Sequence, residues 1–286
     1  MRKIAVINQK GGVGKTTTAV NLAAGIASCG PSVCLLDLDP QAHATLHLGV
    51  SLEPGQQSVY DVLCNDVGLA QVRRQVQENL YLIPSHLDLA AAEMELASEV
   101  GREVILRDRF EQDNQPFDFM ILDCPPSLGV LTLNALTAVD EVILPMQPHF
   151  LALHGLSKLL RTIEIVSKRL NPALRLEGIV LCMYESGTRL AIEVSNDIEE
   201  FLKASATQSP VWASAKFFHT KIRRNIRLAE SPSFGQSIFQ YAPSSNGAED
   251  YLALAHELIN ATTAPTRSEL PSLPITNSAS ISMSTT

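Results

Sequence analysis

Short hydrophobic runs alternate with longer amphipathic segments along most of the chain. The runs are rich in β-branched residues and predict buried strands at residues 3–8, 32–37, 80–84, 117–123, 141–145 and 176–182, with a short last strand at 211–213. Apolar residues at helical spacing predict helices at residues 18–28, 59–63, 87–109, 131–138, 155–170, 189–204 and 248–259. This alternation predicts an α/β fold with a mostly parallel twisted sheet and helices on both faces.

The domain organisation follows from a change in composition near the end of the chain. No linker interrupts residues 1–261, so we expect one domain there. Residues 262–286 contain 12 Ser or Thr and three Pro in 25 positions. Such a segment cannot bury enough apolar surface to order itself, and we expect it to be disordered.

Composition narrows the class of protein. The hydrophobic content of 45% in 286 residues supports a sizeable core. A net charge of −8 excludes an overall polycation, so contact with DNA would require a local basic patch. The five cysteines are scattered without a CxxC pair, which argues against disulfides or a zinc site. We expect no signal peptide, no membrane span and a cytoplasmic location.

A glycine-rich loop lies between the first predicted strand and the first predicted helix. It contains Lys10, Gly11, Gly12, Val13, Gly14, Lys15, Thr16 and Thr17. Glycines let backbone N–H groups crowd around an anion, and the helix N-terminus adds partial positive charge. The pattern predicts a P-loop for ATP, in which Lys15 neutralises the β- and γ-phosphates and the Thr16 hydroxyl binds Mg²⁺.

The loop departs from the strict P-loop pattern at its start. Gln9 stands where the first glycine is required, and a second lysine, Lys10, precedes Gly11. This is the deviant Walker A form of the loop.

Further motifs accompany the loop in a fixed order. They are Asp-Leu-Asp-Pro-Gln at 37–41, Leu-Asp-Cys-Pro-Pro-Ser at 122–127, Leu-Thr-Leu-Asn-Ala-Leu at 131–136 and Asn-Ile-Arg-Leu-Ala-Glu-Ser-Pro-Ser at 225–233. Together they resemble the ParA/Soj family of chromosome- and plasmid-partitioning ATPases over about residues 1–260. Related ATPases such as MinD and the carboxysome-positioning proteins share parts of this pattern.

The resemblance implies roles for the strand-end acids and for Lys10. Asp123 would hold Mg²⁺, Asp39 would orient the attacking water, and Asp37 would support Mg²⁺ or its waters. Lys10 would reach across an ATP-dependent homodimer to the nucleotide of the other subunit.

The resemblance also implies contacts with the base. Asn225 would contact adenine, and the residue two positions before it would line the base. The family usually has Ile-Pro at this point, whereas this chain has Ile222-Arg223. Met183 is a further candidate, with plain core packing as the alternative.

A basic stretch carries the second half of the expected function. No acid occurs from Ala213 to Ala229, and this stretch is the densest cationic segment of an acidic chain. The candidate DNA-binding residues are Arg189, Lys216, Lys221, Arg223, Arg224 and Arg227. They would bind DNA phosphates without reading sequence. The alternative is a solvated face with ion pairs. Gly187 stands where the family often has an arginine.

The expected function is therefore ATP-dependent DNA partition. An ATP-bound sandwich dimer would bind DNA non-specifically on the nucleoid, and a ParB-like partner would stimulate slow hydrolysis and release it. Three alternatives remain: a ParA-type ATPase that positions a protein cargo such as a microcompartment or cluster, a MinD-like membrane-cycling ATPase, and a metabolic enzyme such as an amide-forming ligase.

Overall fold

The computed structural model describes residues 1–53, 55–149, 152–207 and 209–260. The expected tail at 262–286 lies outside the described residues. The strands are β1 (Arg2–Val6), β2 (Val33–Asp37), β3 (Arg74–Gln77), β4 (Leu80–Ile83), β5 (Phe119–Asp123), β6 (Glu141–Met146), β7 (Arg175–Tyr184) and β8 (Lys216–Arg223).

The helices flank these strands along the chain. They are α1 (Lys15–Ser28), α2 (His43–His47), α3 (Val59–Cys64), α4 (Leu69–Val72), α5 (Leu89–Glu95), η1 (Leu96–Ser98), α6 (Ile105–Gln112), α7 (Val130–Ala138), α8 (Ala152–Arg169), α9 (Arg189–Ser205), α10 (Ile226–Glu230), η2 (Ser231–Phe234), α11 (Ile238–Tyr241) and α12 (Asn246–Asn260). No helix in the described part of the chain is both long and apolar enough to cross a membrane.

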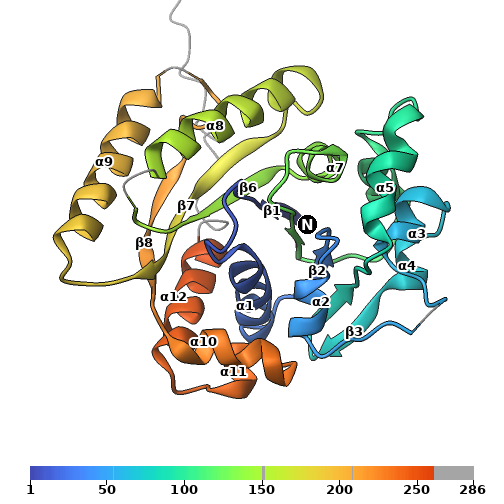
Figure 1. Cartoon of the computed structure of the whole chain (residues 1–286), viewed down its shortest axis with the longest axis horizontal. Coiled ribbons are helices and arrows are strands. Elements are labelled where there is room, and N and C mark those ends of the chain that lie inside the picture. The colour runs from blue at the N-terminus through green and yellow to red at the C-terminus, as the bar shows by residue number, and fades with distance from the viewer. Residues whose placement is uncertain (54, 150–151, 208, 261–286) are drawn as a thin grey trace, which may run out of the picture.

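One eight-stranded sheet runs through the molecule in the order β3-β4-β2-β5-β1-β6-β7-β8 (Figure 1). Every neighbouring pair is parallel except β3 and β4, which are antiparallel. The apolar side chains of α1, α2, α11 and α12 pack on one face. Those of α3 to α9 pack on the other. The α/β fold with helices on both faces is therefore confirmed.

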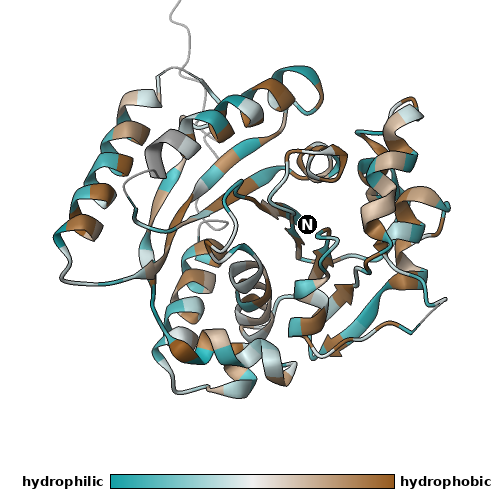
Figure 2. Cartoon of the chain, viewed as in Figure 1, coloured by the Kyte–Doolittle hydropathy of each residue, from teal (hydrophilic) through white to brown (hydrophobic). Residues whose placement is uncertain are grey.

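The central strands are hydrophobic on both faces because helices cover both, and Figure 2 colours them mainly brown. The edge strand β8 instead mixes apolar residues with basic and polar ones, and only Phe218 and Ile222 are buried in it.

The prediction of a strand at 211–213 is wrong. Residues 210–214 form turns, and the last strand is β8. Val211 and Trp212 are buried, and the Trp212 indole N–H donates to the carbonyl of Ser205 at 2.9 Å. Their apolar character therefore reflects packing at the end of α9. Strands β3 and β8 were missed because an edge strand has only part of its surface buried.

Candidate nucleotide-binding site

The glycine loop links β1 to α1 and is held in shape by its own contacts. Gly12 and Gly14 have φ of +73° and +93°, a backbone region that favours glycine, and Gly14 caps the start of α1. The Asn8 side chain accepts from the Lys10 N–H at 3.0 Å and donates to the Pro145 carbonyl of β6 at 2.8 Å. The start of the loop is thus tied to the sheet.

Lys15 lies within this loop at the first position of α1. Its side chain is buried, and its Nζ donates to the Lys10 carbonyl at 3.2 Å. Burial lowers the pKa of Lys15, and the nearby carboxylates of Asp123 and Asp39 oppose that shift. The ammonium therefore lies between the loop carbonyl and two acids, where phosphate oxygens would give it a better partner.

Asp37 and Asp123 end the neighbouring strands β2 and β5 at paired positions in the sheet. Both are fully buried, and burial raises the pKa of each above its usual value, to about 6 for Asp37. For Asp123 the adjacent Asp37 adds to the rise, whereas the Thr16 hydroxyl and the Lys15 ammonium oppose it.

The two carboxylates differ in their partners. Asp37 Oδ2 accepts from the N–H and the hydroxyl of Thr45 at 2.8 and 2.7 Å, and Oδ1 accepts from the Asp39 N–H at 3.1 Å. Neither oxygen of Asp123 has a hydrogen-bond partner of ordinary geometry within the described residues. A buried, unpartnered carboxylate is rare in a folded protein and calls for a ligand.

These residues fit a Mg²⁺ ion. Asp123, with Thr16 beside it, supplies the hard oxygen ligands that Mg²⁺ prefers. The described residues contain no group of three or more His, Cys, Asp or Glu placed to hold a metal, so phosphate oxygens would have to complete the coordination. When bound, the ion would place positive charge beside those oxygens.

A cavity of about 850 Å³ opens beside the loop and has a volume typical of small-molecule sites. It is lined from the loop by Gly11, Gly12, Gly14, Lys15, Thr16 and Thr17, and from distant segments by Asp39, Met183, Arg223 and Asn225. The structure thus brings the predicted phosphate and base residues, except Lys10 and Val13, to one cavity. Asp39 Oδ1 accepts from the Gln41 N–H at 2.9 Å, and Asn225 caps α10 through the Arg227 N–H.

Met183 stands out among the cavity residues by its backbone. Its φ is +51°, which costs a residue with a side chain of order 1 kcal/mol. Such strain persists where the surroundings enforce it, and here it places Met183 on the cavity wall.

Several lining residues were not selected from the sequence: Gln41, His43, Pro126, Cys182, Ile222, Ile226, Leu228, Ala229 and Tyr251. Gln41 could have been found, because it directly follows the Asp-Pro pair. Tyr251 could not, because its place depends on α12 packing against α1, where its hydroxyl lies 3.1 Å from Thr18 Oγ1.

Lys10 and Val13 do not line this cavity. They border a separate hollow of about 50 Å³ with Asn8, Met146 and Gln147. The Lys10 side chain is exposed, so it is accessible to a group outside its own nucleotide cavity.

The arginines of the basic stretch form ion pairs with acids that lie outside this stretch. Arg223 pairs with Asp250 and Glu249, Arg224 with Glu185, and Arg227 with Glu230. Lys221 lies 4.5 Å from the centre of the Tyr184 ring, and Arg189 is exposed at the start of α9. Arg224 and Arg227 keep more than half of their side-chain surface exposed.

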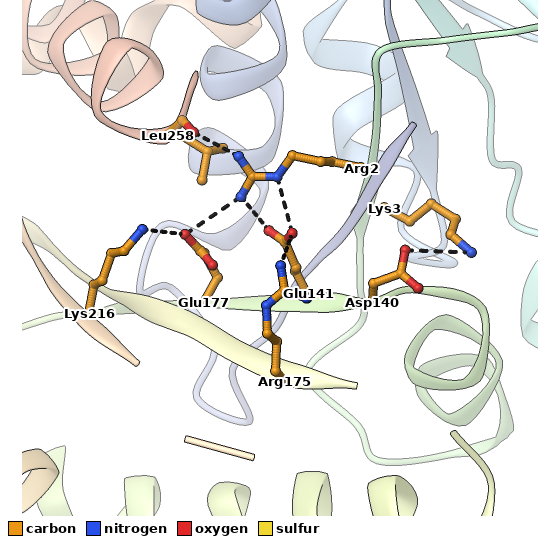
Figure 3. A network of polar contacts seen from close by, with 8 residues as sticks. All are labelled: Arg2, Lys3, Asp140, Glu141, Arg175, Glu177, Lys216 and Leu258. Carbon is orange, nitrogen blue, oxygen red and sulfur yellow. Dashed lines mark hydrogen bonds and ion pairs between the residues drawn. The ribbon is translucent and has the colours of Figure 1, made fainter. Parts of the chain in front are cut away.

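Lys216 is separated from the other basic residues. It starts β8 and Arg223 ends it, so about 23 Å of strand lies between them. Lys216 pairs with Glu177 in a network with Arg2, Glu141 and Arg175 (Figure 3). Arg2 also donates to the Leu258 carbonyl of α12 at 2.7 Å, so this network joins the first strand to the last helix.

Comparisons with known proteins agree with this architecture. The family model described as AAA domain matches residues 1–176. The sporulation initiation inhibitor protein Soj of Bacillus subtilis is 45% identical over 89% of this chain and 97% of its own length. The chromosome partitioning protein ParA of Myxococcus xanthus is 42% identical over 90% of this chain and 88% of its own.

Solved structures repeat the fold. The cobyrinic acid a,c-diamide synthase of Mycobacterium smegmatis with bound ADP and magnesium is 35% identical, covers 92% of this chain and 96% of its own, and has a TM-score of 0.77. The cell division ATPase MinD of Pyrococcus furiosus is 25% identical over 91% of this chain and 99% of its own, with a TM-score of 0.72. By its loop, its strand-end acids and these relatives, the chain belongs to the ParA/Soj family of partition ATPases.

Proposed function

We propose that this protein is an ATP-dependent DNA partition protein. The observation that carries the proposal is the cavity that joins the glycine loop to Asp39, Met183 and Asn225, with the unpartnered Asp123 close to Lys15. The loop and Lys15 would bind the phosphates of ATP, Asp123 and Thr16 would hold Mg²⁺, and Asp39 would orient the attacking water. Asn225, Met183 and Arg223 would surround the base.

ATP would join two copies of the chain. Lys10 is exposed and does not line its own nucleotide cavity, which supports a role at the nucleotide of the partner copy. A lysine supplied in this way would neutralise transition-state charge from the other subunit.

The Lys10→Ala variant tests this role. We expect it to bind a fluorescent ATP analogue within about threefold of the wild type, because Lys15 remains. We expect it to stay monomeric with a non-hydrolysable ATP analogue, as measured by analytical ultracentrifugation. Lys168→Ala, an exposed lysine of α8, is the control and should dimerise normally. A Lys10→Ala protein that dimerises normally would contradict the trans role.

The ATP-bound dimer would bind DNA non-specifically and associate with the nucleoid. The exposed Arg224 and Arg227 form what we call the arginine surface. Two copies of it would roughly double the phosphate contacts, and affinity would then fall steeply with salt. A ParB-like partner would stimulate slow hydrolysis and return the chains to monomers.

ATP turnover measured with DNA, with a ParB-like protein from the same genome, and with both tests the function. We expect slow turnover alone and the largest rate with both. A rate that neither addition changes would argue against a partition switch.

Amide formation is the second candidate, because the cobyrinic acid a,c-diamide synthase structure is 35% identical. Incubation with ATP, glutamine and cobyrinic acid, followed by mass spectrometry, distinguishes the two functions. We expect no amide product.

A further inference from the structure

The hydrolysis acid Asp39 is held by a ring of buried hydrogen bonds that the family motifs do not include. Thr45 of α2 donates its hydroxyl proton to Asp37 Oδ2 at 2.7 Å, and its N–H donates to the same oxygen at 2.8 Å. The Thr45 oxygen also accepts from the Ser85 N–H at 2.9 Å.

Ser85 closes the ring. It follows β4, and its hydroxyl donates to the Asp39 carbonyl at 2.9 Å, while the Asp39 N–H donates to Asp37. Both backbone polar groups of Asp39 are therefore fixed by the ring. Thr45 is 2% exposed and Ser85 is 1% exposed, so water does not compete for these bonds.

Thr45 is the member of the ring that links three segments at once: the end of β2, the start of α2 and the loop after β4. A hydroxyl is needed because one atom must both donate to a carboxylate and accept from an N–H. Valine has the same shape but can do neither, whereas serine can do both.

We propose that Thr45 is a positioning residue for ATP hydrolysis. It holds the Asp37 carboxylate as an internal anchor and, through Ser85, fixes the Asp39 backbone so that the Asp39 carboxylate keeps its place on the cavity wall. The Asp37 carboxylate is thus occupied by hydrogen bonds from Thr45 and Asp39, whereas the neighbouring Asp123 carboxylate is free to bind the cation. This inference rests on the proposed function, because it assigns Asp39 the attacking water.

The test compares Thr45→Val with Thr45→Ser. Misplacement of a catalytic group by about 1 Å can cost on the order of a hundredfold in rate. We therefore expect Thr45→Val to lower kcat by about tenfold or more while KM and the affinity for a fluorescent ATP analogue change by less than about threefold. Thr45→Ser should restore most of kcat. Ser85→Ala, which removes only the link to the Asp39 carbonyl, should lower kcat in the same direction.

Thr137→Val is the matched control. Thr137 is also 2% exposed and donates to backbone carbonyls, but it lies in α7 away from the ring. Its loss should leave kcat unchanged.

A general structural role would give a different result. In Thr45→Val the melting temperature, the nucleotide affinity and kcat would then all fall together. Thr137→Val would show the same losses. This joint result would overturn the proposal. Wild-type kcat in Thr45→Val or in Ser85→Ala would also overturn it. If the wild-type protein itself does not hydrolyse ATP, the proposed function fails; if only the variants behave as wild type, this inference alone fails.

Discussion

Arg223 occupies a position where the ParA/Soj pattern has proline, and its contacts explain how the chain accommodates the change. Its backbone N–H donates to Asp250 Oδ2 at 2.8 Å, and its guanidinium donates to both oxygens of the same carboxylate. Asp250 is only 6% exposed. The pair ties the end of β8 to α12, at the wall of the nucleotide cavity.

We expect Arg223→Pro to destabilise the protein, although it restores the family residue. Proline has no N–H, so the buried Asp250 carboxylate would lose both its backbone and its side-chain donors. Leaving a buried acceptor without partners costs about 1–3 kcal/mol. Urea denaturation followed by circular dichroism measures the change. Arg223→Ala keeps the N–H and should lose less stability than Arg223→Pro; equal stability of the proline variant and the wild type would contradict this account.

The same contacts bear on the DNA hypothesis at this residue. The Arg223 guanidinium is engaged by two acids, whereas Arg224 and Arg227 each have one acidic partner and greater exposure. At this site the sequence could not reveal the ion pairs, because Asp250 and Glu249 come from another element.

At the scale of elements, α2 contacts both β2, which ends in Asp37, and η2, which follows α10 and its Arg227. Gly49 and Gly235 have φ of +71° and +64° and touch through their backbones; a Cβ on Gly235 would lie 2.7 Å from the Gly49 Cα. Beside them, the ring of His47 lies 3.3 Å from the Ser231 hydroxyl. Movement of α2 would therefore be passed to η2 and to the adjoining α10.

His47 makes this joint sensitive to pH. The residue is 1% exposed, and burial lowers the pKa of His47 to about 4. Between about pH 6.5 and 4 the unfolded chain binds a proton at this residue that the folded chain does not, so stability falls as pH decreases. The loss is at most about 3 kcal/mol.

Urea denaturation at several pH values, from 7 to 4, tests this dependence. We expect His47→Gln to lose less stability than the wild type over this range. His219→Gln, which changes an exposed histidine of β8, should follow the wild-type curve. A His47→Gln curve parallel to the wild type would rule out His47 as the source.

At the scale of the whole molecule, the arginine surface lies by the nucleotide cavity near the end of β8, and Lys216 lies at the opposite end of the same strand. If two copies meet at the nucleotide cavity, as proposed, dimerisation would bring two arginine surfaces together, because these surfaces flank the cavity. At its own end of β8, Lys216 is paired with Glu177 in the network with Arg2, Glu141 and Arg175 (Figure 3).

We expect the double variant Arg224→Glu, Arg227→Glu to lose at least about tenfold in DNA affinity, because it replaces attraction to the phosphates with repulsion. Arg224 also lines the nucleotide cavity, whereas Arg227 does not, so Arg227→Glu alone is the variant that should retain its affinity for a fluorescent ATP analogue. Fluorescence anisotropy at several salt concentrations measures both the affinity and the salt slope.

Lys216→Glu distinguishes the two ends of β8 in the same assay. If DNA binds at the arginine surface, this variant should bind DNA as the wild type does. Wild-type DNA affinity in the double variant would remove the arginine surface from the hypothesis.

The sequence predicted the parts of this protein that depend on local chemistry. The glycine loop, the strand-end acids and the buried strands each have a local pattern, and the fold that follows from them is confirmed. The edge strands β3 and β8 lack a continuous apolar run, so they were missed. The acid partners of Arg223, Arg224 and Lys216 were missed because long-range contacts supply them.

The packing of α12 against α1 has a consequence for the synthesis of the chain. The ribosome makes α1 early, but Tyr251 and Leu254, which share its buried cluster, belong to the last helix. Translation proceeds at about 5–20 residues per second, so α1 stays uncovered for on the order of ten seconds or more before α12 has been synthesised. Arg223, Asn225 and Tyr251 also reach the cavity only then. A nascent chain thus has a phosphate loop long before it has a complete nucleotide site, and tight ATP binding would require that α12 had been synthesised and packed.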